Sequence, residues 1–163
     1  MMHQPYPIRR IDSHDLHPRS MTESTLFTKI IEGDIPSFMI TRSDDWVAFL
    51  DVFPRRPGHT LVVPVQPARR LSELSPTTLS NLLEGVVQTQ AILSPHFQTQ
   101  DFLVGVHDGP LAGQEVPHVH IHVIPRTEDD GGLSMMACWP DSQPIGGEPD
   151  FESLSKLAAL LKD

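Results

Sequence analysis

The sequence predicts an antiparallel α+β domain, and three observations lead to this fold class. Short segments rich in β-branched and aromatic residues follow one another with only short turns between them. One long segment, from Ser75 to Leu93, has the apolar spacing of an amphipathic helix. The crossover helices that a doubly wound parallel sheet requires between successive strands are missing from the pattern. We therefore expect a five-stranded antiparallel sheet with one long and one short helix.

The first elements are expected from Leu26 onward. Apolar residues recur at helical spacing from Leu26 to Ile31, and Gly33 is placed to end this short helix. Residues 39–41 and 46–50 are typical of two strands, and a Ser-Asp-Asp turn separates them. This part of the chain therefore predicts a short helix followed by a hairpin.

A third strand and the long helix come next. Residues 60–63 predict the strand, which Pro64 is expected to end. Ser75 is a suitable N-cap and Pro76 suits the first helical position. We expect Pro95 to end the long helix.

The last strands and the C-terminal region complete the pattern. Residues 102–106 and 118–124 predict two strands, and a loop of small residues over 108–114 separates them. Residues 129–148 are rich in glycine, proline and acidic residues, which indicates a loop or a lid. Apolar residues at helical spacing over 151–161 predict a closing helix.

Three regions are therefore expected along the chain. Residues 1–24 contain several prolines and no sustained periodicity, which predicts a disordered or loosely attached N-terminal tail. Residues 25–128 should form the folded domain, and residues 129–163 a C-terminal loop and helix extension.

Composition excludes several classes of function. The 21 acidic and 12 basic residues give a net charge of −9, whereas nucleic-acid-binding proteins concentrate positive charge. The single cysteine, Cys138, excludes an intramolecular disulfide framework and a four-cysteine zinc site. No apolar run approaches the roughly 20 residues of a membrane span, and the N-terminus lacks the apolar region of a signal peptide. We expect a cytoplasmic protein that binds neither nucleic acid nor membrane.

Three alternating histidines carry the clearest chemical signal. On a strand, His118, His120 and His122 share one face and lie about 6.7 Å apart, while the residues between them point into a core. A face that is merely solvated would favour Thr, Lys or Glu instead. One interpretation is a metal site that two of the histidines and Glu115 form, because the third histidine is too distant to complete a tetrahedral site around the same ion. In the other, one neutral imidazole attacks phosphorus and its neighbours bind the anion.

Four segments resemble one known family. Residues 113–122, which join Gly-Gln to the three histidines, resemble the signature of the histidine triad (HIT) superfamily of nucleotide hydrolases and transferases. Residues 26–37 resemble the opening helix and turn of its Hint branch. Residues 51–52 together with 57–64 fit the central strands of the family. Residues 108–114 are closer to the Fhit branch, the diadenosine polyphosphate hydrolases. The resemblance covers residues 26–126.

The resemblance implies a HIT-like fold whose sheet continues across a homodimer. It also implies an enzyme that needs neither a metal nor a cofactor and cleaves at the α-phosphate of a purine nucleotide. The substrate would be an AMP derivative, either a phosphoramidate or a dinucleoside polyphosphate. His120 would form a covalent nucleotidyl-histidine that water hydrolyses. His118 would orient His120, His122 would contact the phosphate, and His59 would support His122.

The same resemblance implies a nucleotide site. Asp51 corresponds to the residue that binds the ribose hydroxyls. An apolar slot for the purine would consist of Leu26, Phe27, Ile30, Phe49 and Val52, although each of them alone is more typical of a plain core. The remaining expected contacts are His107, Gly113, Gln114, Glu115 and Val116. Among these, the backbone amides of Gly113 and Gln114 are expected to donate to phosphate oxygens.

Two positions depart from the family pattern and keep alternatives open. His107 stands where the family usually has Asn or Gln, and Glu115 stands where Ser or Thr often assists the leaving group. Both changes concern the leaving group more than the nucleophile. The first alternative is therefore a nucleotide-binding scaffold with weak turnover, and the second is a metal-dependent hydrolase.

Overall fold

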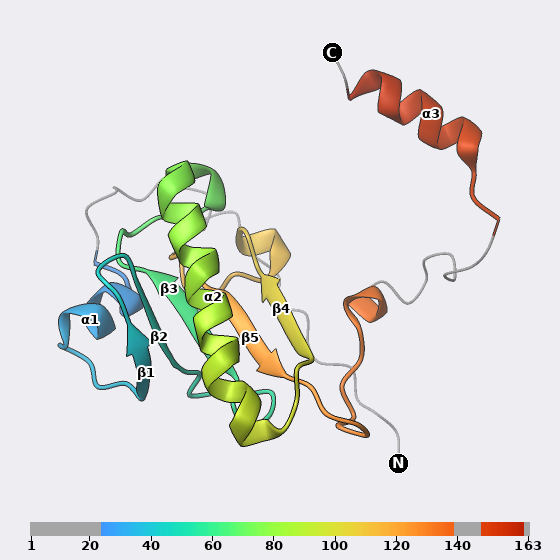
Figure 1. Ribbon diagram of the computed structural model, residues 1–163. Helices are drawn as coiled ribbons and strands as arrows, with labels where there is room; N and C mark the ends of the chain where they lie inside the picture. Colours follow the sequence, from blue (N-terminus) through green and yellow to red (C-terminus); the bar gives the residue numbers. More distant parts are fainter. Residues whose placement is uncertain (1–23, 139–147, 162–163) are drawn as a thin grey trace, which may run out of the picture. The chain divides into compact units, whose positions relative to one another are not determined.

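The computed structural model describes residues 24–138 and 148–161, and its main feature is one five-stranded sheet (Figure 1). The strand order is β1-β2-β3-β5-β4, and every neighbouring pair is antiparallel. The predicted antiparallel α+β class is confirmed. The strands are β1 (Met39–Arg42), β2 (Trp46–Leu50), β3 (Thr60–Pro64), β4 (Phe102–Val106) and β5 (Ile121–Pro125).

The helices begin and end where local chemistry favours it. The short helix α1 spans Leu26–Glu32, and Gly33 closes it with a positive φ of 88° that glycine adopts without strain. The long helix α2 spans Pro76–Phe97, and the Ser75 side chain accepts a hydrogen bond from the Thr78 amide at its start. A third helix, α3, spans Phe151–Leu160. Short 3₁₀ turns occupy Leu71–Glu73, Pro110–Ala112 and Met135–Cys138.

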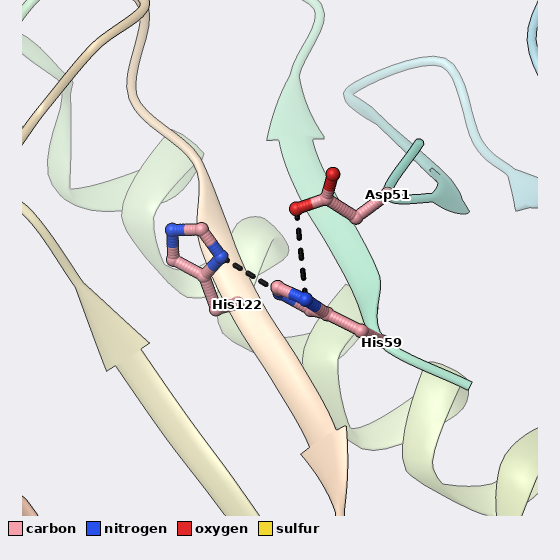
Figure 2. A group of neighbouring side chains, drawn as sticks. All are labelled: Asp51, His59 and His122. Carbon is pink, nitrogen blue, oxygen red and sulfur yellow. Dashed lines mark hydrogen bonds and ion pairs between the residues drawn. The ribbon is translucent and has the colours of Figure 1, made fainter. Parts of the chain in front are cut away.

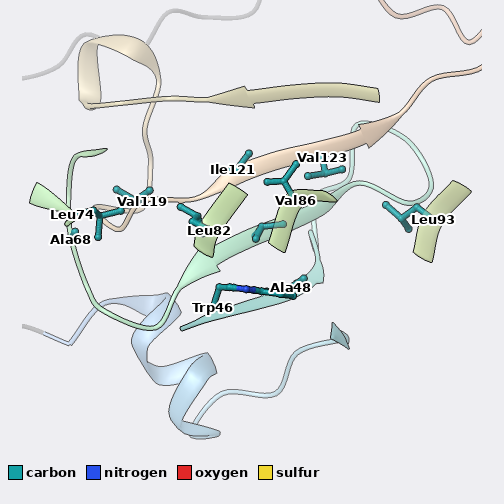
Figure 3. Packing of buried hydrophobic residues seen from close by; sticks show 11 residues of the cluster. Trp46, Ala48, Ala68, Leu74, Leu82, Val86, Leu93, Val119, Ile121 and Val123 are labelled. Carbon is teal, nitrogen blue, oxygen red and sulfur yellow. The ribbon is translucent and has the colours of Figure 1, made fainter. Parts of the chain in front are cut away.

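The two faces of the sheet carry different cores. Helix α2 covers one face, where its Leu82, Val86 and Leu93 pack with buried residues of the sheet such as Trp46 and Val123 (Figure 3). Because burial of apolar side chains is the main stabilising term in folding, this cluster holds α2 to the sheet. Helix α1 contributes to a second cluster, which consists of Phe27, Val47, Phe49, Leu61 and Val63.

The register of the sheet places the histidines on the second face. His122 pairs with Leu61 across β5 and β3, and side chains of directly paired residues share a face. Because Leu61 belongs to the cluster under α1, His122 also lies on the α1 face. Helix α2 therefore stabilises the sheet from behind, and the histidines stand on the opposite side.

Two prolines behave differently from the prediction. Pro64 does not stop the third strand but is its last residue, paired with Trp46, because a terminal strand position tolerates the missing amide hydrogen. Pro95 does not end the long helix, which continues to Phe97 and closes at Gln98 with a φ of 50°. Only two residues of the helix follow Pro95, and Phe97, the last of them, packs against the core and stabilises this end of α2.

The fifth strand is shorter than predicted. The hydrogen-bonded strand begins at Ile121 and not at His118. The residues before it are held differently, because the Val119 amide donates to the Ala68 carbonyl at 2.7 Å and the His118 amide donates to the Val116 carbonyl at 2.8 Å. The side chains still alternate between the two faces of the sheet, since Val119 and Ile121 are buried in the cluster under α2.

The contacts divide the chain into two compact units after Glu128. In the second unit, α3 forms where the apolar spacing predicts a helix, and its apolar side chains are exposed in the described part of the chain. The predicted tail lies outside the described residues except for Ser24, as do residues 139–147 of the predicted loop. None of the described helices is long and apolar enough to cross a membrane.

We predict that Gly85→Ala destabilises the domain. A Cβ atom at Gly85 would lie 2.6 Å from the Trp46 indole, and this overpacking should lower the free energy of unfolding by about 2 kcal/mol despite the better helix propensity of alanine. Urea unfolding measures the change. Ser80→Ala, at an exposed position of the same helix, is the matched control. Equal stability of both variants would contradict close packing of α2 on β2.

Candidate active site

Five histidine side chains meet on the α1 face of the sheet. His118, His120 and His122 come from the segment that enters β5, His59 directly precedes β3, and His107 directly follows β4. Around His122, the ring centroids of His59, His107 and His120 lie at 5.1, 5.2 and 5.0 Å. The three strands β3, β5 and β4 are neighbours in the sheet, which explains why segments far apart in sequence converge here.

Hydrogen bonds at both ring nitrogens hold His118. Its Nε2 lies 2.9 Å from the Pro64 carbonyl oxygen, and its Nδ1 lies 2.8 Å from the Thr25 hydroxyl. A carbonyl oxygen only accepts, so Nε2 carries the ring hydrogen and Nδ1 of the neutral ring accepts from Thr25. The side chain is fully buried, and burial lowers the pKa of His118, although the bond to Pro64 opposes this effect. The His118 imidazole is therefore neutral with one defined tautomer.

The His118 backbone defines the tautomer of His120 in turn. His120 Nδ1 lies 2.7 Å from the His118 carbonyl oxygen, so Nδ1 carries the hydrogen and donates it. Burial lowers the pKa of His120, and this outweighs the opposite effect of the bond to His118. A neutral ring protonated at Nδ1 has its lone pair on Nε2. His120 is therefore arranged as a nucleophile or a base at Nε2.

Phe27 fixes the plane of the His120 ring. The two rings meet edge to face, with centroids 5.1 Å apart and planes at 76°. Phe27 also lies 6.0 Å from the His118 ring and 5.6 Å from the Phe49 ring. Because Phe27 and Phe49 are buried, they form an apolar floor under the histidines, and α1 thereby restrains the orientation of the site.

His59 and His122 form a second hydrogen-bonded chain (Figure 2). His59 Nε2 and His122 Nδ1 lie 2.9 Å apart. The backbone amide of Arg55 donates to His59 Nδ1 at 3.2 Å, so a neutral His59 carries its hydrogen on Nε2 and donates it to His122. His122 consequently holds its own hydrogen on Nε2. That atom is buried and has no hydrogen-bond partner among the described residues.

Burial keeps the second chain uncharged at neutral pH. Burial is the main cause, and together with the neighbouring His120 and His59 it lowers the pKa of His122 to about 4. Burial also lowers the pKa of His59, which is opposed by the negative charge of Asp51. A buried N–H donor without a partner is costly, so His122 Nε2 is arranged to donate to a ligand atom.

Asp51 lies beside His59 but is not hydrogen-bonded to it. The distance from Asp51 Oδ2 to His59 Nδ1 is 3.6 Å, which is too long for a hydrogen bond. Asp51 Oδ1 accepts from the Phe53 amide at 2.8 Å. Oδ2 therefore remains available to an external donor.

Asp51, His59 and His122 also have the donor types of a metal site, with donor atoms within 4.8 Å of one another. In the present network His59 Nε2 and His122 Nδ1 lie 2.9 Å apart with a proton between them. A metal held by His59 Nε2 would displace that proton to Nδ1, which already accepts from the Arg55 amide. The hydrogen bonds thus favour a proton relay over a metal centre at these residues.

The structure distributes the expected purine contacts between surface and core. Leu26 is 47% and Val52 65% exposed, and Ile30 is partly buried against the α1 cluster. These three side chains can meet a ligand directly. Phe27 and Phe49 are buried in the same cluster and lie beneath them. Val116 also packs on this cluster.

The loop before the histidines differs from the expectation in its amides. The Gly113 amide donates to the Pro110 carbonyl and the Gln114 amide to the Gly109 carbonyl. Both amide hydrogens are therefore used in hydrogen bonds within the loop, and they are not free to donate to a phosphate. The Gln114 side chain donates to the Arg69 carbonyl at 2.7 Å, which fastens the loop to the segment after β3.

His107 and Glu115 both lie near the reactive groups. The His107 ring packs edge-on against His122 and also faces Gly113, where an added Cβ would lie 3.6 Å from it. Glu115 is exposed, and its charge acts to raise the pKa of His120 against the effect of burial. The two departures from the family pattern therefore stand beside the site in three dimensions.

Three residues that contribute to the site are not identified by the sequence analysis. Thr25 bonds His118 across 93 positions of the chain, and nothing in the local pattern identifies it except its suitability as an N-cap. Arg55 acts on His59 through its backbone amide, which leaves no signal in residue type. Phe53 acts on Asp51 through its backbone amide, and its exposed side chain is of a kind that surfaces commonly carry.

Comparisons with known proteins identify relatives of this chain. A family model described as HIT domain matches residues 32–129. An adenosine 5'-monophosphoramidase of Schizosaccharomyces pombe is 35% identical over 125 residues, 77% of this chain and 89% of that protein. A bis(5'-nucleosyl)-tetraphosphatase (asymmetrical) of the same organism is 41% identical over 110 residues, 68% of this chain and 59% of that protein. The crystal structure of a histidine triad nucleotide-binding protein from Candida albicans matches with a TM-score of 0.71 and 30% identity, covering 85% of this chain and 95% of that one.

We predict that His122 makes the domain less stable in acid. Its pKa is lowered from 6.5 to about 4 on folding, so between these values the unfolded chain binds a proton that the folded site excludes. The free energy of unfolding therefore falls as pH drops from 7 to 4, and His122 contributes on the order of 3 kcal/mol of that fall. Urea unfolding of the wild type and of His122→Gln at several pH values measures the difference. Parallel pH profiles would contradict a neutral buried His122.

Proposed function

Because the chain belongs to the HIT domain family, we propose that it is a nucleotide hydrolase or nucleotidyl transferase that acts at the α-phosphate of a purine nucleotide. The reaction passes through a covalent nucleotide on His120. The observation that carries this proposal is the tautomer of His120, whose Nδ1 hydrogen is held by the His118 carbonyl at 2.7 Å. An imidazole with a free lone pair on Nε2 is the form that attacks phosphorus.

The first step joins His120 to the substrate. A bond forms between Nε2 and the α-phosphorus, and the bond from phosphorus to the leaving group breaks with its electron pair on the leaving group. The ring becomes positive during attack, and the hydrogen bond from Nδ1 to the His118 carbonyl disperses this charge. In the second step, water attacks the same phosphorus, and the bond from phosphorus to Nε2 breaks with its electron pair on the nitrogen. The water gives up a proton to solvent, the nucleoside monophosphate leaves, and His120 is neutral again.

The neighbouring chain of histidines stabilises the phosphate. His122 Nε2 carries a buried hydrogen without a partner, and its ring lies 5.0 Å from that of His120. A phosphate oxygen is a suitable acceptor for this hydrogen, and developing negative charge strengthens the bond. His59 supports His122 by donating to its Nδ1.

The nucleoside lies beside α1. Asp51 Oδ2 accepts from a ribose hydroxyl, since its other oxygen is already bonded to the Phe53 amide. Leu26, Ile30 and Val52 contact the purine from the surface, and the buried Phe27 and Phe49 support them from below. Residues 25–128 form the HIT domain in this proposal, and residues 129–163 form an extension.

The leaving group belongs to one of two classes. One relative is named as a phosphoramidase and another as a dinucleoside tetraphosphatase, and the substrate of this chain is accordingly an AMP phosphoramidate or a dinucleoside polyphosphate. His107 and Glu115 are the residues to discriminate between them, because both lie beside His120 or His122.

We also propose a homodimer that continues the sheet. Among the described residues, β4 pairs with β5 alone and is an outermost strand of the sheet, and its other edge is suited to pair with a second copy. On α2, Leu83 and Val87 are 59% and 62% exposed one turn apart. Two exposed apolar side chains on one face of a helix are suited to burial in a two-fold interface.

Replacement of the nucleophile should abolish turnover but retain binding. His120→Gln removes the attacking nitrogen, so kcat on adenosine phosphoramidate and on diadenosine tetraphosphate should fall at least about 10³-fold while the Kd for AMP changes little. His96→Gln, an exposed histidine on α2, is the control. Activity of the wild type should persist in a chelator, and mass spectrometry of a quenched reaction should find AMP on His120. Full turnover by His120→Gln would reject the proposed mechanism.

A charge on the exposed face of α2 should separate the subunits. Val87→Glu places a carboxylate in the proposed interface, so sedimentation equilibrium should give half the mass of the wild type. Gln88→Glu introduces the same charge at the next, polar position and should remain dimeric. A monomeric wild type would refute the dimer.

A further inference from the structure

Two helices of this domain begin with the same cap. At α1, the Thr25 hydroxyl accepts from the Thr28 amide at 3.0 Å and lies 3.0 Å from the Thr28 hydroxyl. At α2, the Ser75 hydroxyl accepts from the Thr78 amide at 3.1 Å and lies 2.8 Å from the Thr78 hydroxyl. As N-caps, the two residues therefore do the same work.

The two caps differ in one contact. The Thr25 hydroxyl also lies 2.8 Å from His118 Nδ1. Its oxygen accepts from the Thr28 amide, and its single hydrogen points to His118, because His118 Nε2 already donates to the Pro64 carbonyl. The Thr25 hydroxyl is thus the donor that satisfies a completely buried ring nitrogen.

We propose that Thr25 is a positioning residue for the nucleophile, which it orients through His118. This inference rests on the proposed function and adds to it the group that keeps His118 in one tautomer and one orientation. Three contacts connect the two residues: Thr25 to His118 Nδ1, His118 Nε2 to Pro64, and the His118 carbonyl to His120 Nδ1.

Loss of the Thr25 hydroxyl disturbs His118 and, through the His118 carbonyl, also His120. Without Thr25, the buried Nδ1 has no donor, and the ring relieves this by taking the other tautomer or by turning away from Pro64. Either change moves the residue whose carbonyl holds the His120 hydrogen. The nucleophile then samples orientations in which Nε2 does not face the phosphorus. Binding of the nucleotide does not require this alignment, so kcat responds more than affinity.

The equivalence of the caps provides the experiment. Thr25→Ala removes a cap and the contact to His118, Ser75→Ala removes only a cap, and Thr25→Ser keeps both functions. Both alanine variants should lower the urea midpoint, and Thr25→Ala should lower it more, because it also leaves a buried ring nitrogen without a donor. Only Thr25→Ala should lower kcat, by about 10-fold, with less than about a twofold change in the Kd for AMP. Thr25→Ser should restore kcat to within about twofold of the wild type.

Two results would overturn the proposal. One is a Thr25→Ala variant that keeps the wild-type kcat while it loses stability like Ser75→Ala, since Thr25 would then be a cap only. The other is obtained without substrate, from long-range ¹H–¹⁵N NMR spectra of the histidine rings. We expect a single His118 tautomer with hydrogen on Nε2 in the wild type and in Thr25→Ser, and a mixture in Thr25→Ala. Unchanged spectra in Thr25→Ala would reject the role of Thr25, whether or not the wild type hydrolyses a nucleotide. A wild type that hydrolyses none of the nucleotides tested would count against the proposed function alone.

Discussion

The hydrogen bond between His118 and the Pro64 carbonyl is the contact on which the site depends. A carbonyl cannot donate, so this one bond assigns the hydrogens of His118 and Thr25. The His118 carbonyl assigns the hydrogen of His120 by the same rule. A separate chain from the Arg55 amide assigns those of His59 and His122. The two chains leave neighbouring rings in opposite tautomers: His120 offers a lone pair at Nε2, and His122 offers a hydrogen. A nucleophile beside a donor is the arrangement that phosphoryl chemistry requires.

The fold holds these chains by ordinary packing. Antiparallel register sets His122 opposite Leu61, and α2 packs the other face so closely that a Cβ atom at Gly85 would lie 2.6 Å from the Trp46 indole. Burial does the electrostatic work as well, because it keeps the imidazoles neutral in a protein whose net charge is −9. An acidic protein can therefore receive an anionic ligand through local donors, without a basic surface.

Much of the fold could be predicted because its signals are local. Periodicity located all five strands and the caps at Ser75 and Gly33, and alternation placed the three histidines on one side. Pro95 was misjudged because the contact that stabilises this end of α2, the packing of Phe97, is tertiary. The site was harder. Thr25 and His118 are 93 residues apart, the Arg55 contribution is a backbone amide, and the closure of the Gly113 loop on itself depends on turn geometry. Residue types reveal candidates for chemistry, whereas the placement of each hydrogen follows only from the assembled network.

The most direct test of this account is the tautomeric state of the histidine rings in the free protein at neutral pH, measured by long-range ¹H–¹⁵N correlation. The account predicts a neutral His120 with its hydrogen on Nδ1 and a neutral His122 with its hydrogen on Nε2. A charged His120, or the same tautomer on both rings, would contradict it.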